Sequence, residues 1–251
     1  MKNKLIKNSL SFMFSFFLSF KLLLILLIFL NNFSFICFAD DSFSIIQKII
    51  DTEDEQTLLK IVETYKNSNE ENDPLFVGLA YLNLALIDSI KYSNLAVDWL
   101  SKYKGKTFYS IALAYRGSAI TLVANALSKK GNLIAAASKL DEGFKLMDKA
   151  VKEDGNNIII RFLRAENGIE ITETTPFNRA KVVEEDLNFL KEKLFNFSNL
   201  QKAQYYLILG RLKLFYKKTK EAVEAFKQVI KEAPDSKYAK TAKKYLSKLE
   251  D

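Results

Sequence analysis

A spaced set of small and aromatic residues near the end of the chain constrains the fold more than any other feature. It consists of Tyr206, Leu209, Gly210, Ala222, Phe226 and Pro234. Two antiparallel helices approach closely only where small side chains let their backbones meet, and Gly210 and Ala222 supply such points. Phe226 is expected to fill the space between the helices, and Pro234 to end the second helix after Ala233. The pattern predicts a packed helical hairpin.

Residues 203–236 resemble a tetratricopeptide repeat, in which an aromatic residue, Leu-Gly, Ala, Phe and Pro recur over about 34 residues. The chain departs from that pattern at Lys213, Thr219 and Val229, where the family usually has Tyr, a second aromatic residue and Ala. The resemblance implies an all-α fold, a right-handed α-solenoid of antiparallel helix pairs, and the binding of a protein or peptide along its concave face.

One hairpin cannot bury its own apolar faces, so the resemblance requires degenerate neighbours upstream. Residues 108–126 and 132–152 are predicted to form one such pair, with Gly117 as its point of close approach. Residues 157–170 and 176–195 are predicted to form the next pair.

Helix-start signals add further detail to this arrangement. Thr175 is expected to cap the helix over residues 176–195, with Pro176 at its first position. Residues 75–90 and 93–103 read as another pair. A helix over residues 53–66 is predicted to start at a capping box of Thr52 and Glu55, and Lys66 to Pro74 is predicted to be a loop.

Four upstream segments are similar to segments of exported bacterial repeat proteins that have no assigned activity. They are Arg116-Gly117, Asp148–Val151, Ile160–Arg164 and Pro176–Leu187. The similarity spans most of the chain after residue 39, and it implies a helical repeat domain over residues 40–251 without implying a ligand.

Residues 1–39 have the composition of a targeting segment, with four lysines, no acidic residue and long apolar runs. Cys37-Phe38-Ala39 places small residues where a signal peptidase reads, which predicts a signal peptide and export to the periplasm or medium. The alternative is a retained anchor in the inner membrane, because about twenty apolar residues span a bilayer. Either Met1 or Met13 can serve as the start of this segment.

Composition excludes several function classes. The chain has no histidine, and its one cysteine, Cys37, lies before the predicted cleavage site, so zinc sites and Ser-His-Asp or Cys-His catalysis are not expected. Without residues 1–39 the chain has 33 basic and 30 acidic residues, which is an ordinary solvated surface and argues against nucleic-acid binding. We expect no catalytic residue, no metal and no cofactor.

Arginine has the one suggestive distribution among the polar residues. Four of the five arginines, Arg116, Arg161, Arg164 and Arg211, lie on the predicted first helices of pairs, which line the concave face of such solenoids, and guanidinium groups can clamp a peptide carboxylate. The alternative is that they pair with acids of neighbouring helices. Two aromatic residues, Tyr205 and Phe215, are also expected to face the groove.

These observations favour a non-catalytic scaffold or adaptor of the cell envelope that binds a protein or peptide. A membrane-anchored adaptor is the second hypothesis. The third is a hydrolase that uses carboxylates alone on a helical scaffold, since acids gather at Glu170, Glu173 and residues 184–186.

Overall fold

The computed structural model describes residues 41–250, and within that range the chain is helical with no strand. It divides into two compact units, Met1–Asp51 and Thr52–Asp251; residues 41–51 are helical and belong to the first. The elements of the second unit are α2 (Glu55–Tyr65), α3 (Asp73–Ile87), α4 (Ser89–Lys102), α5 (Tyr109–Lys129), α6 (Leu133–Glu153), α7 (Ile158–Thr174), α8 (Ala180–Lys193), the 3-10 helix η1 (Leu194–Asn196), α9 (Asn199–Phe215), α10 (Thr219–Glu232) and α11 (Lys237–Glu250).

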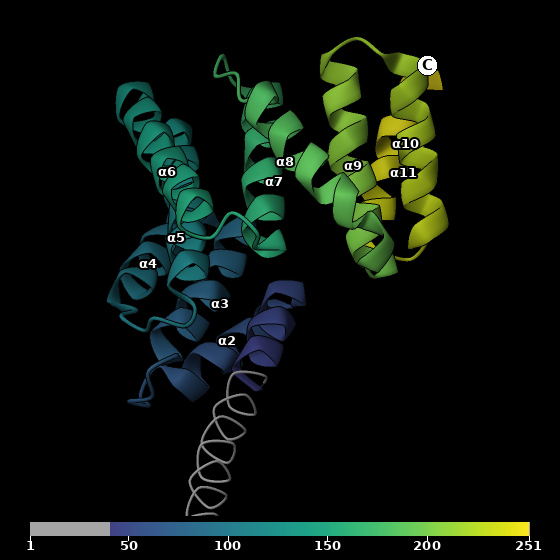
Figure 1. Cartoon of the computed structure of the whole chain (residues 1–251). Helices are drawn as coiled ribbons and strands as arrows, with labels where there is room; N and C mark the ends of the chain where they lie inside the picture. Colours follow the sequence, from purple (N-terminus) through teal and green to yellow (C-terminus); the bar gives the residue numbers. More distant parts are fainter. Residues whose placement is uncertain (1–40, 251) are drawn as a thin grey trace, which may run out of the picture. The chain divides into compact units, whose positions relative to one another are not determined.

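Consecutive helices of the second unit pack as four hairpins, α3 with α4, α5 with α6, α7 with α8 and α9 with α10 (Figure 1). Helix α2 packs on α3 before them, and α11 packs on α10 after them. The pairing that the sequence predicted is therefore confirmed for all four hairpins.

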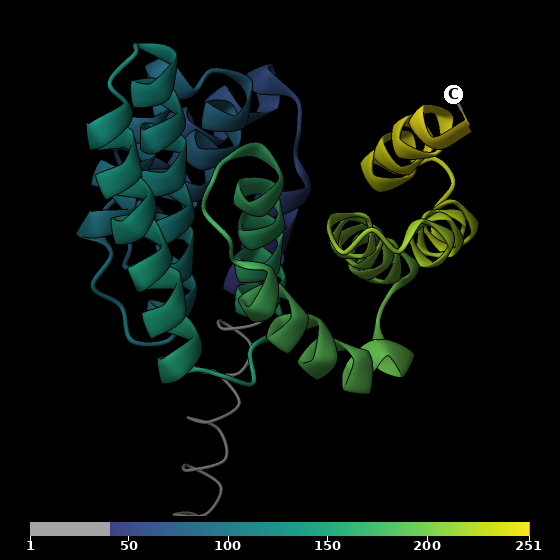
Figure 2. The same cartoon turned by 90° about the horizontal axis from the view of Figure 1, so that it is seen from above.

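Neighbouring hairpins pack together through their first helices and also through the second helix of one hairpin and the first helix of the next. Helix α5 contacts α3, α4 and α7, and α9 contacts α7, α8 and α11, so each hairpin packs on the next in chain order (Figure 2). Helix α5 is the one described helix that is long and apolar enough to cross a membrane, but 72% of its apolar window is buried inside the protein.

A glycine lies in the first helix of each hairpin at the point where the second helix crosses it. A Cβ built on Gly78, Gly168 or Gly210 would lie 2.6, 2.8 or 2.5 Å from a side-chain atom of Leu100, Val183 or Phe226, respectively. Such distances are too short for any Cβ, so each crossing depends on the missing side chain. The predicted role of Gly210 is confirmed.

The α5–α6 crossing is the closest, because its contacts include backbone atoms of both helices. A Cβ on Gly117 would lie 2.5 Å from the carbonyl oxygen of Gly143, and a Cβ on Gly143 would lie 2.6 Å from the carbonyl oxygen of Gly117. The prediction for Gly117 is confirmed, whereas the reciprocal role of Gly143 did not follow from the sequence.

The C-terminal hairpin has the interior that its sequence pattern predicts. Ala222, Phe226 and Val229 are fully buried. The ring of Phe226 lies between Gly210 and the ring of Tyr245 on α11, with a centroid distance of 5.0 Å to the latter. Helix α11 thus covers the last hairpin as a further layer.

Four helix boundaries differ from the predictions. Thr175 ends α7 instead of capping α8: its hydroxyl donates to the carbonyl of Ile171 and accepts from the amide of Phe177, so Pro176 lies in the connection and α8 begins at Ala180. Helix α2 is capped by Asp54, whose carboxylate accepts from the amide of Thr57, and not by Thr52.

The third boundary separates α3 from α4. The carboxylate of Asp88 accepts from the amides of Ile90 and Lys91, so the break falls three residues before the predicted gap at residues 91–92. Pro74 lies in the first turn of α3 and not in the preceding loop.

We predict that Gly117→Ala lowers the free energy of unfolding by about 1–3 kcal/mol, because the new methyl group would overlap a backbone carbonyl that cannot move without separating α5 from α6. Alanine is more favourable than glycine inside a helix by about 1 kcal/mol, so the substitution would raise the free energy of unfolding if the crossing had room for a methyl group. Urea unfolding measures the change.

Ser128→Ala, at an exposed position of the same helix, is the matched control and should change stability by less than about 0.5 kcal/mol. A Gly117→Ala variant as stable as the control would contradict the close crossing.

Candidate functional site

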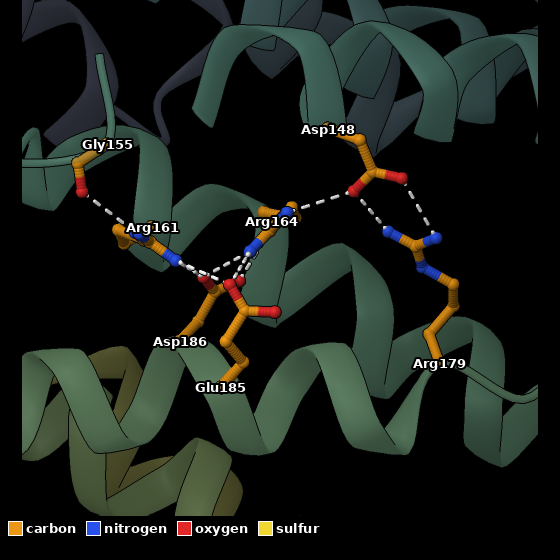
Figure 3. Close-up of polar contacts among 7 residues, drawn as sticks. All are labelled: Asp148, Gly155, Arg161, Arg164, Arg179, Glu185 and Asp186. Atoms are coloured by element: carbon orange, nitrogen blue, oxygen red, sulfur yellow. Dashed lines mark hydrogen bonds and ion pairs between the residues drawn. The ribbon is translucent and has the colours of Figure 1, made fainter. Parts of the chain in front are cut away.

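Two of the arginines proposed to face a groove lie in a buried ion network between hairpins (Figure 3). The carboxylate of Asp186, on α8 and fully buried, accepts from the guanidinium groups of Arg161 at 2.8 Å and Arg164 at 2.7 and 2.8 Å, both on α7. Arg164 also donates to Asp148 of α6 at 3.0 Å. These contacts join α6, α7 and α8.

Arg179, just before α8, completes the network from the other side. It donates to both carboxylate oxygens of Asp148, at 2.6 and 3.1 Å, and its guanidinium lies over the ring of Phe144. Asp148 is thereby shared between Arg164 and Arg179 (Figure 3). Two neighbouring hairpins are thus held together by charges that face each other across the interface.

Burial and pairing act in opposite directions on Arg164. Desolvation of the buried guanidinium lowers its pKa, but hydrogen bonds and the charge of Asp186 outweigh that effect, so the pKa is raised. Arg164 stays charged at every physiological pH and its donors are occupied. A peptide carboxylate would have to displace Asp186 in order to bind there.

Arg211 is engaged in the same way at the next interface. It donates from α9 to Glu170 at 2.6 Å and to Glu173 at 2.6 and 3.0 Å, both on α7. The hydroxyl of Tyr245, on α11, donates to Glu173 at 3.0 Å. Desolvation opposes the charge of Arg211, yet its bonds to Glu173 and Glu170 raise its pKa.

The other three candidate residues do not share one surface. Tyr205 is 4% exposed, so it lies in the core and not in the groove-facing position expected for it. Arg116 is half-buried, and its buried Nε has no hydrogen-bond partner among the described residues. Phe215 is 38% exposed at the end of α9. The structure therefore brings Arg161 and Arg164 together but does not bring the six candidates into one site.

A groove of about 920 Å³ lies instead between α8, α9 and α10. Its apolar lining includes Leu187 of α8 and Tyr206, Leu209, Leu212 and Tyr216 on and just after α9. Its polar lining consists of Glu184, Asn188 and Lys191 from α8 with Lys213, Lys218, Lys220, Glu221, Glu224 and Gln228 from α9, α10 and the turn between them.

Charges of both signs surround this groove. The amine of Lys213 lies 2.6 Å from Glu221, whose pKa its hydrogen bond lowers. Desolvation raises the pKa of Tyr216, as does the charge of Glu184. An apolar strip with acids and lysines beside it can accept a peptide that has one apolar face and charges of both signs.

The groove was not predicted from the sequence. The repeat pattern assigned Tyr206 and Leu209 to the packing between helices, and both do contact the cores of the last hairpins while their remaining surface lines the groove. The wall residues of α8 and α10 gave no signal, because alternating Lys and Glu on a helix is typical of any solvated face.

Four of the five acids named in the hydrolase alternative form ion pairs: Glu170 and Glu173 with Arg211, and residues 185 and 186 with Arg161 and Arg164. The fifth, Glu184, lines the groove. The pKa of Glu166, near Glu170, is raised, because the effect of burial exceeds the opposing effect of a hydrogen bond with Gln204. Within residues 41–250, no group of three or more metal-ligating side chains is positioned to hold a metal ion.

Comparisons of the chain with models of protein families, with curated proteins and with solved structures find no match. Its function must therefore be inferred from its own residues.

We predict that Asp186→Ala lowers the free energy of unfolding by about 3–5 kcal/mol, because it leaves two largely buried guanidinium groups without their central partner. Glu185→Ala, at the adjacent position, is the control: the side chain of Glu185 is 63% exposed, and its loss should cost less than about 1 kcal/mol. Thermal and urea unfolding compare the two. Equal effects would show that Asp186 does not organise the network.

A second prediction concerns Tyr205, whose pKa burial raises to about 12. An unfolded tyrosine loses its proton near pH 10, so between about pH 10 and 12 only the unfolded state is ionised, and stability falls as pH rises. We expect Tyr205→Phe to reduce that fall by up to about 1.4 kcal/mol per pH unit, measured by urea unfolding across this interval. An unchanged slope would show that Tyr205 is not the group responsible.

Proposed function

We propose that the protein is a non-catalytic scaffold or adaptor that binds a protein or peptide in the groove between α8, α9 and α10. The observation that carries the proposal is the shape and chemistry of that groove: its apolar strip of Leu187, Tyr206, Leu209, Leu212 and Tyr216 lies beside charges of both signs. Its volume of about 920 Å³ is sufficient for several side chains of a bound segment.

We interpret the four hairpins as degenerate tetratricopeptide-like repeats of a right-handed solenoid. Support comes from the glycine at each crossing and from the arrangement around Gly210, Ala222 and Phe226 in the last hairpin. Repeats that stack in this way present extended surfaces, and such surfaces favour the binding of a peptide segment over catalysis. The concave-face arginine clamp is the weaker form of the proposal, because Arg161, Arg164 and Arg211 are already paired.

We place this activity in the cell envelope on the composition of residues 1–39, which favours either export after cleavage or retention as an anchor. Those residues lie outside the part of the chain that the structure describes.

The groove can be tested with peptides selected from a random display library against the full-length protein. We predict that Tyr216→Ala weakens binding of the selected peptides about tenfold or more, because an aromatic side chain that lines a groove is a typical hot spot. Fluorescence anisotropy with labelled peptides measures the affinity.

Phe215→Ala is the matched control. Phe215 and Tyr216 are adjacent and almost equally exposed, at 38% and 37%, but only Tyr216 lines the groove. Two outcomes would contradict binding in this groove and favour the surface predicted from the sequence. One is a loss of peptide affinity only in Phe215→Ala. The other is a loss of affinity in a folded Arg211→Ala variant while Tyr216→Ala has no effect.

A further inference from the structure

The turns inside the four hairpins lie at one edge of the second unit. The hydroxyl of Ser118 on α5 bonds the side chain of Asn167 on α7, and Arg211, near the end of α9, pairs with Glu173, near the end of α7, so these first helices lie side by side. Lys129, at the end of α5, donates to the side chain of Ser89 at the start of α4. Figure 1 shows the α5–α6, α7–α8 and α9–α10 turns on the same side.

Exposed large apolar side chains occur at each of these turns. They are Leu86 (66% exposed), Ile87 (54%) and Ile90 (48%) at the first turn, Leu133 (66%) and Ile134 (88%) at the second, Phe177 (42%) at the third, and Phe215 and Tyr216 at the fourth. Single exposed apolar residues are normal, but their recurrence at four successive turns of one edge needs a physical reason.

Lysines accompany these apolar residues. They are Lys91, Lys129, Lys130, Lys217 and Lys218, all exposed. Among the residues that the structure describes, Lys91, Lys129, Lys130 and Lys217 form no ion pair with a carboxylate.

The acids at this edge are already engaged. Asp88 caps α4, Glu173 pairs with Arg211, and Glu221 pairs with Lys213 and Lys218. The edge is therefore apolar and positively charged.

The opposite edge, formed by the connections between hairpins, has a different character. Its connections and adjoining helix ends contain the acids Glu70, Glu71, Asp154 and Asp235, together with the exposed lysines Lys104 and Lys106. Its exposed large apolar residues are Tyr109, Phe195 and Leu200. The edge of the hairpin turns differs in that exposed large apolar side chains occur at every one of its turns, whereas on the opposite edge they occur only in the α4–α5 and α8–α9 connections.

We propose that the edge formed by the four hairpin turns docks on an anionic lipid surface. Exposed apolar side chains at successive turns, such as Ile134, can enter the boundary between headgroups and acyl chains without a complementary cavity on the partner. The lysines beside them keep their amines at the level of the anionic headgroups. The row of turns fits a planar, deformable partner better than it fits a folded protein. The proposal does not depend on the groove between α8, α9 and α10.

The test uses the full chain with Cys37, its one cysteine, replaced by serine. An environment-sensitive fluorophore is attached after Ile134→Cys or, as the matched control, after Asn156→Cys, an exposed position just beyond the other end of α6. Each protein is mixed with phosphatidylcholine vesicles that contain or lack phosphatidylglycerol and a brominated lipid quencher.

We expect quenching and a blue shift at position 134 but not at position 156, and a stronger signal with phosphatidylglycerol. Replacing Lys129 or Lys130 with glutamine should lower the ratio of docked to undocked protein about fivefold for each lysine removed. Because residues 1–39 can hold the chain on a vesicle by themselves, the difference between the two positions is the decisive quantity.

Equal quenching at both positions, or none at position 134, would overturn the proposal. A blue shift at position 134 that appears without vesicles and grows with protein concentration would also overturn it, since it would assign the edge to contact with a second copy. Circular dichroism of each variant excludes unfolding as the cause.

Discussion

The distance between the two helices of each hairpin controls the arrangement of everything built on them. At Gly117 and Gly143 the backbones meet so closely that neither position has room for a methyl group, and at Gly210 the ring of Phe226 occupies the space that a side chain would take. Close crossings let short hairpins bury a continuous core, which no single hairpin of this size can do alone. The glycines thus fix the spacing of the helices, and the surfaces between hairpins follow from it.

Ion pairs hold neighbouring hairpins together, whereas the glycine crossings set the spacing of the helices within each hairpin. Asp186 holds Arg161 and Arg164 in a largely buried network that reaches Asp148 on the preceding hairpin. A buried ion pair contributes little net stability relative to an apolar contact, but breaking one is costly, so such a network fixes one register of neighbouring helices over others. Arg161, Arg164 and Arg211, which the sequence analysis offered as ligand clamps, therefore hold helices together. The binding that we propose is expected where the surface is hollow and its apolar side chains are accessible.

The extent to which the sequence predicted this structure depends on the range of the interactions involved. Helices, their pairing and the roles of Gly117 and Gly210 follow from local periodicity and from spacing within one hairpin. The start of α8 was predicted wrongly because a Thr-Pro pair is typical of a helix start. In the structure the hydroxyl of Thr175 donates to the carbonyl of Ile171 and so belongs to the end of α7. Tyr205 and Tyr206 differ in burial although they are adjacent, and the partners of Arg161, Arg164 and Arg211 lie on other helices. Those features depend on the register between helices, which no single-helix pattern contains.

The groove and the edge formed by the four hairpin turns lie close together at the α9–α10 turn. Tyr216 lines the groove and is also one of the exposed aromatic residues of that edge, and Lys218 belongs to both surfaces. A bound peptide that covers Tyr216 would reduce the exposed apolar area of the edge at the fourth turn. The first two turns lie on earlier hairpins, so their exposed apolar residues would stay accessible; these are Leu86, Ile87, Leu133 and Ile134. Contact with a lipid surface through the first two turns is therefore compatible with an occupied groove. Contact through the fourth turn competes with it, so the two surfaces are coupled by the residues that they share.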